Sequence, residues 1–174
     1  MITLGSDPEL FVRTQDGVYV PSYIALNGQE AHILPYGTLT PDGAAIEFTV
    51  QPDENARRVT YRIGSNMLET RSIIQEYVPG GDVSICPAAN FAEYIPQYPP
   101  EAGAFALQRF GCSPDKCMHG KLMHRPNPKK YPWRTTGGHL HFGIGDAIKD
   151  MTQVFYITAA LDRFLGCISV IGCN

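Results

Sequence analysis

Two histidines separated by a single residue are the side chains whose types and spacing most clearly suggest chemistry. They close the segment Arg134-Thr135-Thr136-Gly137-Gly138-His139-Leu140-His141. Residues two apart on a strand project to the same side, so both imidazoles can reach one ion or one phosphate. The two glycines let a ligand approach the backbone, and Arg134 carries a positive charge nearby. The simpler alternative is a pair of exposed strand histidines without a ligand.

Carboxylates elsewhere in the chain are candidates for the same site. Asp7 and Glu9 are two apart in the segment Gly5-Ser6-Asp7-Pro8-Glu9-Leu10-Phe11, so they share one face of a strand, where acids are often simply solvated. Glu47 stands between Ile46 and Phe48, and a carboxylate without a partner in a central strand is costly. If these strands are neighbours, carboxylates and imidazoles line one polar face. That set of ligands suits Mg²⁺ or Mn²⁺.

A second possible metal site consists of Cys112, Cys117, His119 and His124. Their spacing, Cys-x4-Cys-x-His-x4-His, is more compressed than the usual two-pair zinc pattern. We therefore interpret this segment as a substrate loop with free thiols, with zinc binding as the alternative. The basic run from Lys121 to Lys130 either attracts an anionic substrate or is a solvated loop.

Composition restricts the class of protein and its partners. The chain has 174 residues, of which 44% are apolar and 18% are charged, which is typical of one globular domain. We therefore expect residues 1–174 to form a single domain. The formal net charge of −3 provides no basic field for nucleic acid. There is no signal-peptide pattern and no run of roughly 20 apolar residues, so we expect a cytoplasmic protein without membrane contact.

Strands are expected where turn signals or alternation mark short apolar segments. The first runs from Ile2 to Val12, with Pro8 at an edge or a bulge because proline lacks an N–H group. Asp16-Gly17 is a hairpin signal that leads into a strand at Val18 to Val20. Another short strand is expected from Asp82 to Cys86.

Two further strands alternate strictly and carry the candidate residues. In Ala45 to Val50 and in Gly138 to Ile144, one face is apolar and the other holds Glu47 or the two histidines. We expect the apolar faces to pack against helices and the polar faces to converge on each other. The residues expected in the core are Ile46, Phe48, Val50, Leu140, Phe142 and Ile144.

Two helices are predicted from steps of three and four between apolar residues. The first runs from Asp53, its expected cap, to Tyr77, and Pro79-Gly80-Gly81 ends it. The second begins at the expected cap Asp146 and continues to Leu165. Residues 87–132 are rich in Pro, Gly and Tyr and are expected to form functional loops. This order predicts an α+β domain with helices on one face of a mostly antiparallel sheet.

Four motifs in this order resemble the phage-associated carboxylate–amine (COOH.NH2) ligases of type 2, relatives of glutamine synthetase and glutamate–cysteine ligase. The motifs are Gly5-Ser6-Asp7-Pro8-Glu9-Leu10-Phe11, Asp42-Gly43-Ala44-Ala45-Ile46-Glu47-Phe48 with Pro52 after it, Cys112-Ser113-Pro114-Asp115, and the segment from Arg134 to His141. The resemblance extends from residue 5 to about residue 165. Each motif alone is weak, and their common order makes the resemblance more specific.

The resemblance implies a curved sheet of the glutamine synthetase catalytic-domain type, whose concave face binds ATP and Mg²⁺ or Mn²⁺. It also implies a role for each matching residue. The implied metal ligands are Asp7, Glu9, Glu47, His139 and His141. The implied nucleotide-binding residues are Arg134, Gly137, Gly138 and His141. The implied catalytic residues are Asp42 and Arg134, whose charge would offset that of a transferring phosphoryl group.

The implied reaction is ATP-dependent amide formation between a small-molecule or peptide carboxylate and an amine, through an acyl phosphate. A phage-encoded enzyme of this kind would act in the host cytoplasm. Two other functions stay open from the residues: a metal-dependent hydrolase that uses the His139 and His141 strand, and a catalytically inactive binding module. The sequence does not specify the acid, the amine or the oligomeric state.

The end of the chain suggests that more of the domain follows. The last residues, Gly166-Cys167-Ile168-Ser169-Val170-Ile171-Gly172-Cys173-Asn174, form an apolar run of the kind that begins a strand. The family that the chain resembles continues beyond this point with further strands. We expect the chain to be the N-terminal portion of a longer domain, with a compact variant as the alternative.

Overall fold

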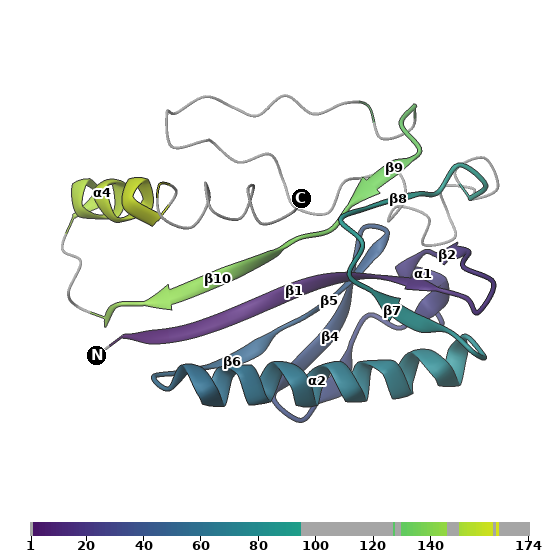
Figure 1. The fold of residues 1–174 in the computed structure, drawn as a ribbon, viewed down its shortest axis with the longest axis horizontal. Coiled ribbons are helices and arrows are strands. Elements are labelled where there is room, and N and C mark those ends of the chain that lie inside the picture. Colours follow the sequence, from purple (N-terminus) through teal and green to yellow (C-terminus); the bar gives the residue numbers. More distant parts are fainter. Residues whose placement is uncertain (1, 95–126, 128–129, 146–149, 162, 164–174) are drawn as a thin grey trace. The chain divides into compact units, whose positions relative to one another are not determined.

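The computed structural model of the chain describes residues 2–94, 127, 130–145, 150–161 and 163 (Figure 1). The chain divides into two compact units: one contains Ile2–Ser113 and Pro126–Gly143, and the other contains Met1, Pro114–Arg125 and Ile144–Asn174. Some expected features lie outside the described residues. They are the cysteine and histidine cluster at 112–124, most of the basic run at 121–130, Asp146 and the apolar run at 166–174.

An antiparallel sheet forms the first unit around the 11-residue strand β1 (Thr3–Arg13). The other strands are β2 (Tyr19–Val20), β3 (His32–Leu34), β4 (Gly37–Asp42), β5 (Ala45–Phe48), β6 (Val50–Asp53), β7 (Asp82–Ser84), β8 (Ala88–Asn90), β9 (Trp133–Thr135) and β10 (Gly138–Gly143). The main path is β10-β1-β5-β4-β3, and β2, β6 and β7 also pair with β1. The sheet is strongly curled, like half of a barrel. β8 and β9 form a separate two-stranded sheet.

Three helices lie in the described parts of the chain: α1 (Ser22–Ala25), α2 (Ala56–Tyr77) and α4 (Met151–Leu161). The α+β class and the mostly antiparallel sheet are therefore confirmed. α4 belongs to the second unit and begins where the Asp150 carboxylate accepts a hydrogen bond from the Gln153 N–H group at 3.0 Å. No helix among the described residues is long and apolar enough to cross a membrane.

The larger apolar core lies between one face of the sheet and the helices α1 and α2. Alternation along β1 places Leu10 and Val12 on this face and Phe11 on the opposite one. The predicted core residues Ile46, Phe48 and Val50 are buried here, as expected. The core also contains Val20, Ala25, Leu26, Leu34, Leu39, Val59, Ile74 and Val78. The predicted packing of the first helix, at 53–77, against the apolar face of the sheet is thus confirmed for α2.

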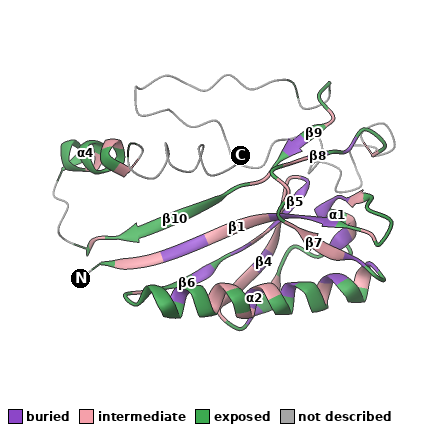
Figure 2. Ribbon diagram, in the orientation of Figure 1, coloured by how far each residue is buried: buried purple, intermediate pink, exposed green. Residues whose placement is uncertain are grey.

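The expected burial of Leu140 and Phe142 is wrong. Leu140 is 58% exposed and Phe142 is 39% exposed, and neither belongs to a core cluster. β10 is exposed along its whole length, in contrast to β1 (Figure 2). The reason is its position at the end of the strand order, beyond β1, whereas α2 contacts β6, β7, β1 and β3. Alternation specifies which side chains share a face but not whether a helix covers that face.

The first helix begins later than predicted, because Asp53 does not cap it. Asp53 ends β6, where its carboxylate pairs with Arg62 at 2.8 Å and with Arg58 at 3.6 Å. Asn55 is the cap instead, and its side chain accepts a hydrogen bond from the Arg57 N–H group at 3.0 Å. The predicted end of the helix before Pro79 is confirmed, since α2 ends at Tyr77.

Pro8 lies in the middle of the sheet and not at an edge, because β1 has strands on both sides. Toward β10 it is opposite Gly138. Toward the other side the registered pairs end at Ser6, opposite Val50 of β6, and resume at Glu9, opposite Glu47 of β5. Pro8 therefore lies at the position where the partner of β1 on this second side changes from β6 to β5. No registered pair on that side includes Pro8, so its missing N–H group interrupts none of them. The predicted strand at 45–50 is likewise divided at Thr49.

Candidate metal-binding site

Strand pairing brings the predicted residues together on the face of the sheet opposite α2. β1 and β10 are antiparallel, with Asp7 directly opposite His139, and His141 follows two residues along β10. On its other side β1 pairs with β5, where Glu9 is directly opposite Glu47. Opposed residues in antiparallel strands point to the same face. The predicted convergence of these acids and imidazoles is confirmed, and their role as metal ligands stays a prediction.

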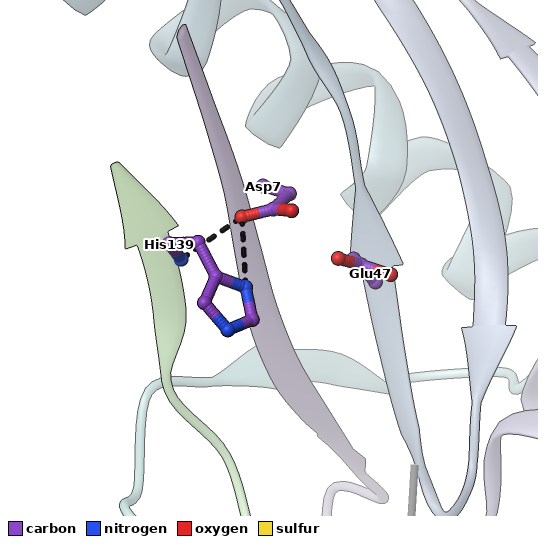
Figure 3. A group of neighbouring side chains, drawn as sticks. All are labelled: Asp7, Glu47 and His139. Carbon is purple, nitrogen blue, oxygen red and sulfur yellow. Dashed lines mark hydrogen bonds and ion pairs between the residues drawn. The ribbon is translucent and has the colours of Figure 1, made fainter. Parts of the chain in front are cut away.

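Asp7, Glu47 and His139 form the tightest part of this group. One ligand atom from each of the three lies within 4.8 Å of the other two. Figure 3 shows the Asp7 carboxylate on β1 between the His139 ring on β10 and the Glu47 carboxylate on β5. Three strands that are distant in the sequence thus each supply one donor.

Asp7 is held by three contacts with β10. Its carboxylate accepts a hydrogen bond from the His139 N–H group at 2.9 Å and lies 3.2 Å from Nδ1 of the same residue. Its other oxygen lies 2.9 Å from Nε2 of His141. Burial raises the pKa of Asp7, but the hydrogen bonds and charges of His141 and His139 outweigh it, so the pKa is lowered. Asp7 therefore stays ionised and orients both exposed imidazoles.

Glu47 has the opposite electrostatic situation. Burial, followed by the nearby carboxylates of Asp7, Asp42 and Glu9, raises its pKa from 4.5 to about 7. Asp42 belongs to β4, which pairs with β5 so that Asp42 is opposite Ala45, two residues from Glu47. Four carboxylates therefore gather on one face, and a cation placed among them would relieve their repulsion.

Glu9 and the glycine pair are in direct contact. Glu9 Oε2 accepts a hydrogen bond from the Gly137 N–H group at 2.9 Å, and the Glu9 N–H group donates to the Gly137 carbonyl at 3.1 Å. A Cβ at Gly138 would lie 3.2 Å from Cα of Pro8, whereas a Cβ at Gly137 would meet nothing within 4 Å. Close packing of β10 on β1 thus favours glycine at position 138. At 137 the structure imposes no such requirement.

Arg134 lies in β9 and is only 3% exposed. Its guanidinium Nη1 donates to the carbonyl oxygens of Tyr131 and Trp133. It pairs with Ala89 of β8, which packs against Phe11 in the smaller apolar cluster. Burial lowers the pKa of this arginine. The structure therefore places Arg134 in a rigid, buried setting, and its predicted contact with a phosphoryl group stays a prediction.

The donors present fit a divalent cation that prefers oxygen. Two carboxylates and one imidazole offer mainly hard oxygen atoms. Such a donor set suits Mg²⁺ or Mn²⁺, whereas sulfur-rich donor sets select zinc. His139 Nδ1 lies on the side of the ring that faces Asp7, 3.2 Å from its carboxylate (Figure 3). Asp7 had the weaker support in the sequence, yet it is central here. In the sequence, the spacing of two between Asp7 and Glu9 indicated only that the two acids share a face. The pairing of β1 with β10 is what places Asp7 beside the histidines.

Comparisons of this chain with protein families, curated proteins and solved structures find no match. The candidate site therefore rests on the geometry described above.

Proposed function

We propose that this chain carries the metal-binding face of an ATP- and Mg²⁺-dependent carboxylate–amine ligase. The observation that carries the proposal is the group Asp7, Glu47 and His139, whose ligand atoms lie within 4.8 Å of one another on one face of a curled antiparallel sheet. The motifs that resemble the type 2 carboxylate–amine ligases contain these same three residues. The proposed fold is accordingly that of the glutamine synthetase catalytic domain.

In this proposal the carboxylates and His139 hold Mg²⁺, or Mn²⁺, at the sheet surface. A cation held there would supply positive charge that offsets the charge of the ATP phosphates during phosphoryl transfer. A substrate carboxylate oxygen attacks the γ-phosphorus and ADP leaves. The amine then attacks the acyl carbon and inorganic phosphate leaves. Asp42, on the same face, would hold the amine in its ammonium form and accept its proton, while Arg134 would offset phosphoryl charge.

A metal-dependent hydrolase is the second candidate. It is favoured by the contacts of Asp7 with both imidazoles, because a carboxylate that orients a histidine ligand is common where a metal activates water. The two functions differ in their nucleotide requirement. A hydrolase of this kind would turn over without ATP, whereas the ligase would release phosphate from ATP only with an acid and an amine present.

Metal binding and turnover are tested separately. Mn²⁺ binding, measured by electron paramagnetic resonance, should weaken at least tenfold in Glu47→Gln and in His139→Gln. Glu76→Gln, which changes an exposed carboxylate on α2, serves as the control. Phosphate release from ATP is then followed with a panel of carboxylates and amines. Unchanged Mn²⁺ affinity in both site variants would contradict the metal site. ATP-independent hydrolysis in a parallel ester and amide panel would favour the hydrolase.

A further inference from the structure

A cavity of about 330 Å³ opens in the first unit, and the metal-binding group does not contribute to its lining. Two turns surround it. One closes the β1–β2 hairpin, where the Gly17 N–H group donates to the Thr14 carbonyl at 3.0 Å. The other follows β8, where the Tyr94 N–H group donates to the Phe91 carbonyl at 3.0 Å. The volume of the cavity falls within the range of small-ligand sites.

Tyrosine rings form the aromatic part of the lining, and buried phenylalanines hold them in place. The ring centroid of Tyr19 lies 5.8 Å from that of Phe11 and 6.2 Å from that of Phe91. Phe91 also holds Tyr94, at 6.5 Å. Both tyrosines are therefore supported by the smaller apolar cluster. The other lining residues are Gly17, Val18, Asn90, Ala92 and Glu93.

Glu93 gives the cavity a negative charge, and it is the one ionised side chain among the described lining residues. Burial, followed by the charge of the Glu93 carboxylate, raises the pKa of Tyr94, so the two side chains are close to each other. Arg13 is opposite Tyr19 in the hairpin, but it does not belong to the described lining, and on its other side it is opposite Asp82. A negative charge beside tyrosine rings favours a cation.

The hydrogen-bonding groups of the lining favour a cation that has no N–H group. The Asn90 side-chain oxygen already accepts a hydrogen bond from the Ala92 N–H group at 2.9 Å. Val18 and Ala92 offer only apolar side chains, and Val18 is 44% exposed. A primary ammonium group carries three donors that each need an acceptor. An alkylated ammonium ion instead presents methyl groups to apolar and aromatic walls and interacts with them through its charge.

We infer that this cavity binds an alkylated ammonium ion, with the rings of Tyr19 and Tyr94 as its aromatic contacts and Glu93 as its counter-ion. Aromatic rings beside a carboxylate are a recurring way to bind quaternary ammonium groups. A fully alkylated nitrogen has no N–H group and cannot accept an acyl group. The ligand of this cavity is therefore different from the amine that the proposed ligase reaction consumes.

The cavity is also separate from the metal-binding face. The buried side chains of Phe11, Ala89 and Phe91 occupy the face along β1 between the cavity and Asp7. Binding of an alkylated ammonium ion is therefore expected to be independent of a metal ion at Asp7.

The test uses choline as the probe, because it carries a trimethylammonium group. Binding to the full chain is measured from amide chemical shifts in NMR spectra, and the shifts of Gly17, Val18 and Ala92 should change in a saturable way. Dimethylbutanol, in which carbon replaces the nitrogen of choline, keeps the shape without the charge and should bind about tenfold more weakly. Ethanolamine, which keeps the charge but has three N–H donors, should also bind more weakly than choline.

Substitutions in the cavity separate the roles of charge and ring. Glu93→Gln keeps the shape of an exposed side chain and should weaken choline binding about threefold, with dimethylbutanol binding unchanged. Tyr94→Leu should weaken choline binding about tenfold, whereas Tyr94→Phe keeps a ring and should bind choline like the unmodified chain. Tyr61→Leu and Glu76→Gln change exposed side chains of α2 outside the cavity and should leave choline binding unchanged.

The comparison of probes needs only the unmodified chain, so a variant that fails to fold does not affect it. The inference would be overturned if choline gave no saturable shift at these amides, or if dimethylbutanol or ethanolamine bound as tightly as choline. Unchanged choline binding in a folded Tyr94→Leu variant would also overturn it. The affinity for choline should be equal with Mg²⁺ and with EDTA. A requirement for Mg²⁺ would assign the probe to the metal-binding face and contradict a separate site.

Discussion

Glu47 is a partly buried carboxyl group in the middle of the sheet, and its ionisation should make the stability of the fold depend on pH. Its pKa in the folded protein is raised from 4.5 to about 7, first by burial and then by Asp7, Asp42 and Glu9. The folded chain therefore binds this proton more tightly than the unfolded chain. The resulting contribution to stability is fully present below pH 4.5 and is lost as the pH rises through 7.

Replacement of Glu47 by glutamine should therefore change stability in a pH-dependent way. At pH 8 without metal, Glu47→Gln should stabilise the fold by about 1–2 kcal/mol, a value reduced for the partial exposure of the group. At pH 4.5 the difference should be close to zero. Urea unfolding at both pH values measures it, with the exposed Glu76→Gln as the control. A Glu47→Gln effect equal at the two pH values would show that the carboxylate is not perturbed.

Phe48 and Phe142 should respond very differently to truncation, although both belong to strands with the same alternating pattern. Phe48 is fully buried in the larger core, and Phe48→Ala should cost about 3–5 kcal/mol. Phe142 is partly exposed and lies outside both clusters, so Phe142→Ala should cost roughly 1 kcal/mol or less. Chemical denaturation of the two variants measures the difference. Equal losses would show that β10 is covered.

At the scale of elements, one buried side chain of α2 connects it to the break between β5 and β6. Asn66 is fully buried, and its Nδ2 group donates to the Thr49 carbonyl at 3.1 Å. Its oxygen accepts from the Tyr36 N–H group at 3.0 Å, at the turn before β4. A Cβ at Gly37 would clash with the Thr49 carbonyl. These contacts fix the chain two residues after Glu47.

Loss of the Asn66 amide should therefore destabilise the fold more than an average polar substitution. Asn66→Ala removes two partly buried hydrogen bonds and leaves the Tyr36 N–H group and the Thr49 carbonyl without this partner, at a cost of about 2–4 kcal/mol. Asn55→Ala, which removes only the exposed cap of α2, should cost about 1 kcal/mol. Thermal or urea unfolding compares the two. An Asn66→Ala cost no greater than that of Asn55→Ala would contradict this role.

At the scale of the whole molecule, metal binding should be coupled to folding, because strands β1, β5 and β10 each supply one donor. An ion that binds only the folded chain at about a hundredfold excess over its Kd should add about 2.7 kcal/mol to the free energy of unfolding. The gain should be smaller at pH 6, since Glu47 must release its proton first. Unfolding with Mn²⁺ or with EDTA measures it. Equal stability in both would argue against a site formed by folding.

Local patterns in the sequence were sufficient to predict the individual elements that carry the site. Alternation at 45–50 and at 138–144 predicted which face holds Glu47 and the histidines, and the Asp-Gly signal predicted the β1–β2 hairpin. These features depend on residues within a few positions of one another. The short helix α1 and the β3–β4 pair were not predicted, because their segments are too short for a clear period.

Tertiary structure alone decided the neighbours of each strand. The sequence could show that Asp7 and Glu9 share a face, but not that Asp7 would lie opposite His139 and Glu9 opposite Glu47. It also could not show that Leu140 would be exposed, since burial depends on which element covers a face. Periodicity within a strand follows from backbone geometry and is visible locally. Register between distant strands follows from the packing of the whole sheet, and that packing makes Asp7 the centre of the candidate site.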